Sequence, residues 1–292
     1  MEKILYVGMD VHKNTIAMAC AAQDEAVTML GIIPNTFAAL NSMLRKLVSR
    51  GERLKLVYEA GPGGYTLCRY LRDNGFHCIV AAPSLIPRKS GDKIKTDRRD
   101  AIMLTRLHRA GELTSVCVPD ADDEAMRDLF RVRVDSKKMC KAVKQQLLGF
   151  LLRHGISYSA GKTHWTKTHY AWLDALSIPH PVQQLVLQEY LDAIRQLEKR
   201  TTRIEEMLLA NALNWKRLPE VKKLQCLRGI SFITAVGLMA ELGDLRRFPS
   251  ARQMMAYVGL VPSESSSSND PHQRLREQSG GHYPQVFEAL VD

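Results

Sequence analysis

Four carboxylates stand where predicted strands end and where a predicted helix begins. Asp10 closes the apolar run ILYVGMD, and Glu59 closes the run LKLVYE directly before a turn rich in glycine and proline. Asp97 and Asp100 fall three residues apart in the first turn of a predicted helix, so they share one face of that helix. Because charged groups avoid protein cores unless they are paired or bind metal, carboxylates at these positions indicate a functional site.

The chemistry that suits such a group is metal-dependent. In a sheet whose first and fourth strands are neighbours, all four carboxylates would converge at one edge, where they would repel one another unless cations lay among them. Clusters of oxygen ligands suit Mg²⁺ or Mn²⁺, and two such ions about 4 Å apart stabilise an in-line displacement at phosphorus. A structural reading also exists, since Asp97 and Asp100 favour a helix N-terminus and Asp10 can begin a turn with His12 and Lys13. The coincidence of all four favours the metal site.

The charge of the chain points to a polyanionic partner. Among 292 residues, 41 are Lys or Arg and 31 are Asp or Glu, which gives a formal net charge of +10. Nucleic acid is the first candidate for the partner, a membrane surface is the second, and a merely solvated basic surface is the alternative. The stretch 131–153 holds seven basic residues against one acidic residue. The candidate contacts to a phosphate backbone are Arg88, Lys89, Lys93, Lys95, Arg98 and Arg99 beside the carboxylates, and Lys137, Lys138, Lys141 and Lys144 in that stretch.

The remaining composition narrows the class of protein. No apolar run approaches the roughly 20 residues that span a bilayer, and the first residues lack the apolar core of a signal peptide. The six cysteines show no CxxC spacing, which argues against a structural zinc site and a disulfide framework. These features indicate a cytoplasmic protein that works in a reducing environment, with no membrane partner.

The order of predicted elements indicates an α/β domain followed by helices. Three strands, a helix, a strand, a helix, a strand and a helix follow one another over 1–121, an order that predicts a mixed sheet with helices on its faces. Residues 122–215 read as two long helices that pack together, form a coiled coil with another subunit, or lie singly on the first domain. A third, mainly helical region covers 216–292. Within it, Leu227, Gly229 and Ala235 fit a helix-hairpin-helix turn, although Ser231 replaces its second glycine and an ordinary helical hairpin fits equally well.

Four motifs carry a resemblance to a known family: GMDVHK, YEAGPGGY, KTDRRDA and GDLRRFPSARQMMAYVGLVPSESSS. In this order, over residues 1–268, they resemble the Asp-Glu-Asp-Asp (DEDD) insertion-sequence transposases, which are related to pilin-gene invertases and include bridge-RNA-guided recombinases. The resemblance implies a RuvC-like, ribonuclease H-type N-terminal domain, a coiled-coil middle and a C-terminal transposase domain. It assigns the acidic roles to Asp10, Glu59, Asp97 and Asp100. It also implies Mg²⁺ or Mn²⁺, element and target DNA, a structured guide RNA, and a homo-oligomer, either a dimer or a tetramer.

The family pattern also includes a nucleophilic serine three residues after a glutamate. Here Glu264 is followed by a run of serines, so the pattern points to Ser267, with Ser266 as the neighbouring alternative. A serine hydroxyl that attacks a phosphodiester holds the DNA end covalently and conserves the bond energy for religation.

The chain departs from the expected pattern after about residue 269. A glycine-rich basic stretch is expected there, but the segment 270–292 holds four acidic residues and two arginines, as in a frameshifted or truncated end. Two other functions therefore remain open. One is a metal-dependent nuclease or junction resolvase that uses the N-terminal domain alone, and the other is an inactive copy that still binds nucleic acid.

Overall fold

The computed structural model of the protein describes residues 4–49, 53–87, 96–159, 161, 163–258, 263–264 and 273–274. In these ranges the chain forms two compact units, which meet in sequence between Pro119 and Asp120. No helix in the described part is both long enough and apolar enough to cross a membrane.

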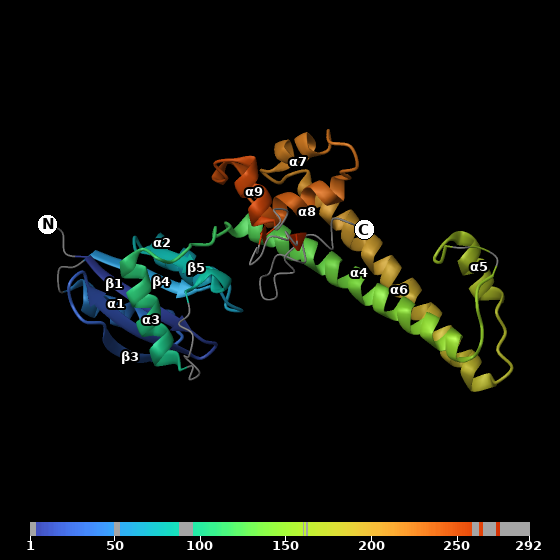
Figure 1. Ribbon diagram of the computed structural model, residues 1–292, viewed down its shortest axis with the longest axis horizontal. Coiled ribbons are helices and arrows are strands. Elements are labelled where there is room, and N and C mark those ends of the chain that lie inside the picture. The colour runs from blue at the N-terminus through green and yellow to red at the C-terminus, as the bar shows by residue number, and fades with distance from the viewer. Residues whose placement is uncertain are drawn as a thin grey trace. The chain divides into compact units, whose positions relative to one another are not determined.

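The first unit is a five-stranded mixed sheet with helices on both faces (Figure 1). The strand order is β3-β2-β1-β4-β5; β1 and β3 are antiparallel to β2, whereas β4 is parallel to both β1 and β5. The predicted order of elements is confirmed, and the fold is the predicted ribonuclease H-like type. The elements are β1 (Ile4–Val11), β2 (Thr15–Ala22), β3 (Thr28–Pro34), α1 (Phe37–Val48), β4 (Arg53–Glu59), α2 (Thr66–Asp73), β5 (His77–Ala81), a 3₁₀ turn η1 (Pro83–Leu85) and α3 (Asp97–Ala110).

Local sequence signals set the starts of α1 and α3 and the end of α3. The Thr36 hydroxyl accepts a hydrogen bond from the Ala39 amide and begins α1, and the Thr96 hydroxyl does the same for the Arg99 amide at the start of α3. Gly111 ends α3 with a φ of +72°, a left-handed conformation that glycine adopts without strain. The start of α3 at Asp97 is therefore fixed by a cap that is visible in the sequence.

The two faces of the sheet are covered by different helices. Helices α1 and α2 bury Leu40, Leu44 and Leu71 against one face, and α3 buries Ala101 and Leu104 against the other. The face under α3 is lined by small residues of β1 and β2, so this helix lies close to the strands.

Gly8 and Thr105 form the closest contact between α3 and the sheet. The Gly8 amide donates to the Thr105 hydroxyl oxygen at 3.0 Å, and that oxygen lies 3.1 Å from the Ala19 carbonyl oxygen of β2. A methyl group on Gly8 would lie 2.5 Å from both the Ala101 carbonyl oxygen and the Thr105 amide nitrogen. The Thr105 hydroxyl thus packs against Gly8 and Ala19, which face each other on β1 and β2, and only glycine at residue 8 leaves room for it.

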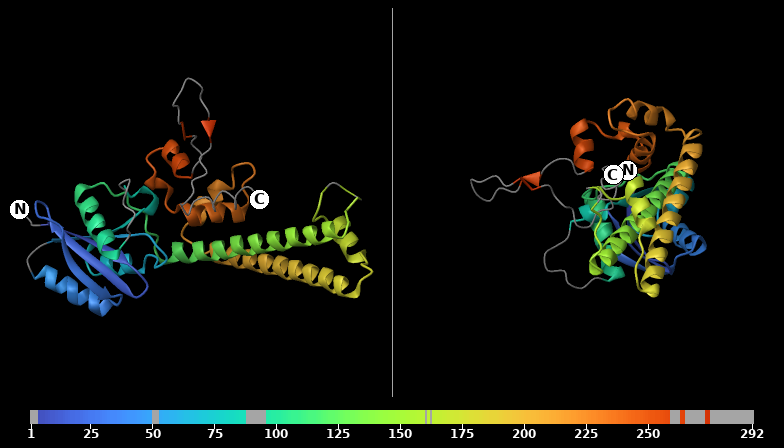
Figure 2. Two further views of the ribbon diagram at one scale, coloured as in Figure 1. Left: turned by 60° about the horizontal axis from the view of Figure 1, so that its bottom comes forward. Right: turned by 90° about the vertical axis from the view of Figure 1, so that its right-hand side faces the viewer.

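The second unit is built on two long antiparallel helices, α4 and α6, which lie side by side in both views of Figure 2. The two predicted long helices are confirmed, and they pack against each other. Pro181 occupies the first turn of α6, where its missing amide removes no helical hydrogen bond. The elements are α4 (Ala121–Arg153), α5 (Lys167–Ala175), α6 (Pro181–Ala212), α7 (Leu218–Leu224), α8 (Phe232–Leu242), a 3₁₀ turn η2 (Leu245–Arg247), α9 (Ala251–Tyr257), and the short strands β6 (Ser263–Glu264) and β7 (Gln273–Arg274).

One end of the helix pair shares its core with the small helices that follow it. Phe130 of α4, Leu208 of α6 and Met239 of α8 are buried in one cluster, to which Val221 of α7 also belongs. Asp123 lies buried in this region, where it accepts hydrogen bonds from the Trp215 indole and the Arg217 guanidinium. Packing therefore joins α7 and α8 to the long helices, whereas the sequence suggests a division at residue 215.

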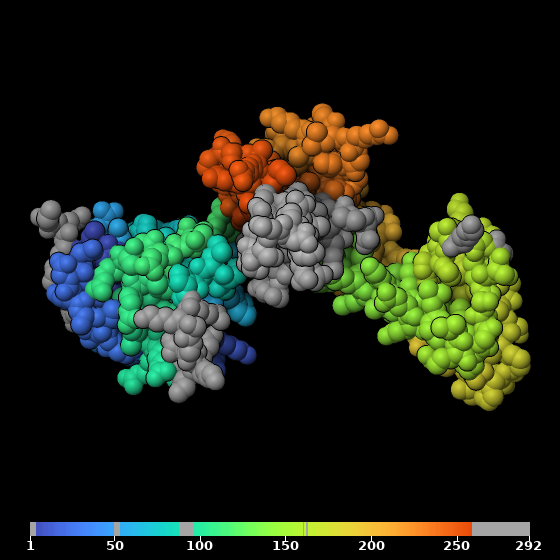
Figure 3. Space-filling model, viewed as in Figure 1, coloured from blue at the N-terminus to red at the C-terminus, as the bar shows by residue number. Residues whose placement is uncertain are grey.

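The other end of the helix pair carries α5, a helix that the sequence does not predict. Thr166 caps it by accepting from the His169 amide, and Leu173 is buried against α4 and α6. Figures 1 and 3 show α5 with the far ends of α4 and α6, away from α7 and α8 within the same unit. Its nine residues, rich in Thr, His and aromatic side chains, have weak helix propensity, so tertiary burial rather than local preference forms it.

The turn between α7 and α8 has features of a helix-hairpin-helix turn and of an ordinary helical hairpin, the two structures that the sequence leaves open. Gly229 has a φ of +89°, which suits a tight turn, and the Ser231 hydroxyl accepts from the Thr234 amide to begin α8. Ser231 therefore acts as a helix cap at the position where a helix-hairpin-helix would have glycine.

Replacing Gly8 with alanine is expected to loosen α3 from the sheet. Alanine is normally better than glycine inside a strand by up to about 1 kcal/mol, but the methyl group would collide with backbone atoms of α3, and such overpacking costs about 1–3 kcal/mol. Native-state hydrogen exchange of amides in β1 and α3 should accelerate accordingly, a local measurement that does not assume one unfolding transition for two units.

The matched control is Gly63→Ala, because a methyl group at Gly63 meets no atom within 4 Å. This variant should leave exchange in β1 and α3 unchanged. Equal protection in Gly8→Ala and in the wild-type chain would contradict the close contact described above.

Candidate active site

Asp10 lies at the end of β1 on the face of the sheet that α3 covers. Alternate residues of a strand point to opposite faces, so Asp10 points to the same side as Gly8, the residue that touches α3. Met9, between them, is fully buried on the other face. The Asp10 side chain keeps 15% of its surface exposed, so it stands at the rim of the core.

Glu59 ends β4, the strand next to β1. The parallel register pairs Met9 with Tyr58, so Asp10 and Glu59 are the next positions along these neighbouring strands. Val57 packs in the core under α3, and the alternation of the strand turns Glu59 to that same face. The structure therefore brings Glu59 to the edge where Asp10 lies, as the strand ends predict, and leaves it half-buried.

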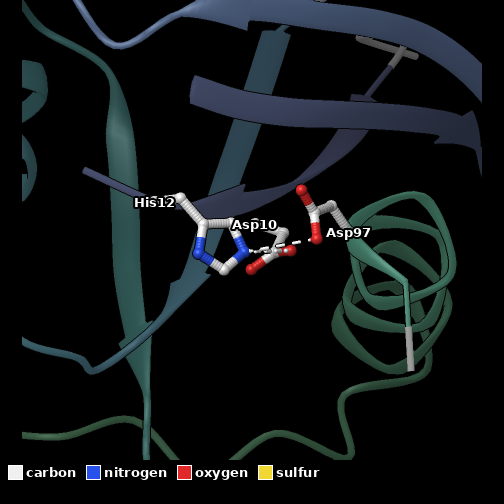
Figure 4. Close-up of side chains that lie close together, drawn as sticks. All are labelled: Asp10, His12 and Asp97. Atoms are coloured by element: carbon white, nitrogen blue, oxygen red, sulfur yellow. Dashed lines mark hydrogen bonds and ion pairs between the residues drawn. The ribbon is translucent and has the colours of Figure 1, made fainter. Parts of the chain in front are cut away.

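The first turn of α3 brings a third acid to Asp10. An oxygen of Asp10, an oxygen of Asp97 and a ring nitrogen of His12 all lie within 4.8 Å of one another. Figure 4 shows these three side chains lying close together. His12 Nε2 is 3.1 Å from Asp10 Oδ2 and 3.5 Å from Asp97 Oδ1. Asp100, one turn further along α3, is half-buried and close enough to act on the ionisation of Asp10.

Burial and neighbouring charges act on the carboxyl group of Asp10. Burial raises the pKa of Asp10 above its ordinary value, and the negative charges of Asp100 and Asp97 raise it further, while the His12 ring acts in the opposite direction. Positive charge bound beside Asp10 would therefore stabilise its ionised carboxylate. A cation among these side chains would relieve both the burial of the carboxylate and the repulsion between the acids.

His12 is the site residue that the sequence does not single out. The pattern of residues suggests for it only a place in a turn after Asp10. The one signal in the sequence that could have identified His12 is its spacing of two residues from Asp10, because residues two apart lie on the same side of an extended chain. The turn holds it firmly: the His12 amide donates to the Thr15 carbonyl oxygen at 2.9 Å, and the Asn35 amide group donates to the His12 carbonyl oxygen at 2.7 Å.

These residues fit a divalent cation. Carboxylate oxygens are the ligands that Mg²⁺ and Mn²⁺ prefer, and donors bound side by side to one such ion lie about 3 Å apart, close to the separations that link His12 to the two acids. Asp10 and Asp97 would hold the ion, with Asp100 and Glu59 beside them. Among the residues that the structure describes, this is the one cluster of three or more metal-binding side chains.

The predicted basic contacts other than Lys144 fall into three groups. Arg98 and Arg99 are exposed in the first turn of α3, beside the acids. Lys138 and Lys141 are exposed on α4 and Lys137 is half-buried nearby, with spacings of three and four residues that bring them together on the helix. The other predicted contacts of the acidic edge, namely Arg88, Lys89, Lys93 and Lys95, lie outside the described residues.

Several charges of the 131–153 stretch are engaged inside the second unit. Lys144 pairs with Glu198 at 2.7 Å, Arg133 pairs with Glu205 at 2.7 Å, and Arg131 binds both carboxylate oxygens of Glu241 at 2.7 and 2.8 Å. The structure thus commits Lys144, a predicted nucleic-acid contact, to an acid of α6. The sum of charges in the sequence overstates the positive charge that this helix presents, because the partners lie far away in the chain.

The predicted nucleophile falls, in the sequence, between two short segments that the structure describes. Strands β6 and β7 are antiparallel, with Ser263 opposite Arg274 and Glu264 opposite Gln273. Ser266, Ser267 and the departure predicted after residue 269 lie outside the described residues.

Two family patterns match the chain. The DEDD transposase pattern of the insertion sequence IS110 matches residues 7–156, and the pattern of the transposase IS116/IS110/IS902 family matches residues 221–283. The first match contains Asp10, Glu59, Asp97 and Asp100. The second contains the serine run and extends past residue 269.

Individual relatives agree with these matches. The chain is 42% identical over 264 residues to the putative transposase y4qE of Sinorhizobium fredii, covering 90% of this chain and 64% of that protein. It is 34% identical over 254 residues to the transposase for insertion sequence element IS1533 of Leptospira borgpetersenii, covering 86% and 73%. A probable family 20 transposase of Pseudomonas aeruginosa is 28% identical over 222 residues, covering 74% and 63%. The chain thus spans roughly two thirds of the length of these relatives, and it belongs to the IS116/IS110/IS902 family of transposases, with an N-terminal part of the DEDD type.

Proposed function

We propose that this chain is a DNA transposase or site-specific recombinase of an insertion sequence, and that Mg²⁺ or Mn²⁺ assists its cleavage and exchange of DNA strands. The observation that carries the proposal is the meeting of Asp10 and Asp97 at the edge of a ribonuclease H-like sheet, with Asp100 and Glu59 beside them. Membership of a transposase family supports it.

The four acids have a shared task in this proposal. Asp10 and Asp97 hold a divalent cation, and Glu59 and Asp100 provide further negative charge at the same edge. A divalent cation held there would supply the positive charge that offsets the charge developing on the phosphoryl group during displacement. The carboxylates fix its position, because β1, β4 and the capped end of α3 are rigid elements rather than loops.

Ser267 is the proposed nucleophile. Its hydroxyl oxygen attacks the phosphorus of the scissile phosphodiester and forms a serine–phosphate ester. The strand end that leaves keeps its oxygen and takes up a proton. Attack on this ester by the hydroxyl of another strand forms a new phosphodiester and returns the proton to the serine, so no external energy source is needed.

The partners follow from the chemistry and the family. DNA of the element's ends and of the target is the proposed substrate in the cytoplasm, a structured RNA encoded by the element is the proposed guide, and a homodimer or homotetramer is the proposed assembly. Lys137, Lys138 and Lys141 of α4, with Arg98 and Arg99 beside the acids, are the proposed phosphate contacts among the described residues.

The first prediction for this function is a covalent adduct with DNA. Purified chain, incubated with Mg²⁺ and an end-labelled duplex that carries the element's own terminus, should form a labelled species that survives a denaturing gel. Ser267→Ala should abolish it because the attacking oxygen is gone, and Asp10→Asn should reduce it strongly because the cation loses a ligand. Ser266→Ala is the matched control and should retain the adduct.

Other outcomes of this experiment have defined meanings. Metal-dependent nicking without any adduct would replace the proposal with a nuclease or junction resolvase. Binding without nicking or adduct would indicate an inactive copy. An adduct that persists in Ser267→Ala and disappears in Ser266→Ala would move the nucleophile by one residue.

The second prediction concerns the salt dependence of DNA binding. Replacing Lys137, Lys138 and Lys141 together with glutamine should flatten the slope of log affinity against log salt, because fewer counterions leave the DNA when the protein binds. The change expected on duplex DNA is about 0.9 for each phosphate that the variant no longer neutralises. Fluorescence anisotropy over a range of salt concentrations measures this slope.

The control for this prediction replaces the same three lysines with arginine. This variant keeps the charge and should keep the slope of the wild-type chain. If the glutamine variant also keeps that slope, the DNA contacts lie on another surface.

A further inference from the structure

We propose that His12 is a direct ligand of the cation at the acidic edge, and that it gives this site a preference for Mn²⁺ over Mg²⁺. The inference deepens the proposed metal-dependent function and rests on it. It adds to the four acids a nitrogen donor, which changes the chemical class of ion that the site selects.

The position of the imidazole carries the argument. A single nitrogen, His12 Nε2, faces both acids, at 3.1 Å from Asp10 Oδ2 and 3.5 Å from Asp97 Oδ1 (Figure 4). These separations are close to the roughly 3 Å expected between neighbouring donors on one ion with bonds of about 2.1 Å. If His12 served only to orient Asp10 through a hydrogen bond, its Nε2 nitrogen would have no reason to lie close to Asp97 as well.

The backbone holds His12 in this place while its ring stays accessible. The Asn35 amide group donates to the His12 carbonyl oxygen and the His12 amide donates to the Thr15 carbonyl oxygen, so the turn between β1 and β2 is tied on both sides of the residue. The side chain itself is 53% exposed. An ion arriving from solvent can therefore displace the hydrogen bond between His12 and Asp10 without disturbing the fold.

The donor set determines the preference for the ion. Mg²⁺ takes oxygen ligands and gives up its water reluctantly, whereas Mn²⁺ belongs, at the low end, to the first-row series of ions that bind mixed nitrogen and oxygen sites, a series to which Mg²⁺ does not belong. Two carboxylates and an imidazole form such a mixed site. In this set the Nε2 atom of His12 would be the nitrogen donor, beside oxygen donors from Asp10 and Asp97.

The experiment measures metal binding by the whole chain, without DNA. Metal-stripped protein is titrated with Mn²⁺, and free Mn²⁺ is followed by electron paramagnetic resonance. Pulsed measurements on the bound ion then detect coupling to nitrogen. In the wild-type chain the bound Mn²⁺ should show histidine nitrogen coupling, a readout that requires no variant to fold.

His12→Ala should lose that coupling and weaken Mn²⁺ binding by about tenfold or more, since even residues that only support a metal ligand cost about 10–100-fold. Mg²⁺ binding, measured by competition with Mn²⁺, should change much less. Lys13→Ala is the matched control, because Lys13 is an exposed neighbour in the same turn and should leave both ions unaffected.

Asp10→Asn separates this inference from the proposed function. If Asp10→Asn abolishes Mn²⁺ binding while His12→Ala binds as the wild-type chain does, or if the wild-type spectrum lacks nitrogen coupling, His12 is not a ligand and the inference alone is overturned. If Mn²⁺ still binds normally to Asp10→Asn, the metal site at this edge fails, and the inference fails with it.

Discussion

The contact between Gly8 and Thr105 fixes where α3 lies on the sheet, and the geometry of the acidic edge depends on it. The Thr105 hydroxyl takes the Gly8 amide as its donor and reaches the strand pair itself, so α3 can neither slide nor lift without losing a buried hydrogen bond. An unsatisfied buried amide costs about 1–3 kcal/mol, enough to hold one register of the helix against its alternatives. Asp97 and Asp100 reach the end of β1 because the helix is held at Thr105, two turns further along.

The same closeness sets the electrostatics of the edge. Asp10 stands at the boundary of the core, so its carboxylate is partly withdrawn from water while the negative charges of two acids of α3 act on it. A group of partly buried carboxylates is unfavourable when no positive charge compensates it, and it becomes favourable when it surrounds a cation. The fold thus places negative charge where a metal can compensate it. His12 is held by the turn that follows β1, and it meets the same carboxylates without belonging to the sheet.

The second unit uses its charges differently. Arg131, Arg133 and Lys144 bind acids that lie across the helix pair or on α8, and Asp123 is buried beneath Arg217 and Trp215. The pairs of Arg133 with Glu205 and of Lys144 with Glu198 stabilise one alignment of α4 with α6, and the pair of Arg131 with Glu241 fixes α8 against α4, because each partner left alone would be a partly buried charge. The surface that remains for a nucleic acid on α4 is therefore narrower than the basic sequence suggests.

The sequence by itself determined the elements of the first unit and their order, the two long helices, and the family. Alternating and helical periodicities place the strands and long helices, Thr36 and Thr96 mark helix starts, and the four acids stand at element ends where local patterns alone reveal them. Tertiary structure decided what depends on distant partners. It formed α5 through burial of Leu173, paired Lys144 with Glu198, and brought His12 between Asp10 and Asp97. Periodicity reports how a residue relates to its neighbours in the chain, whereas ion pairing and ligand convergence depend on which surfaces fold together.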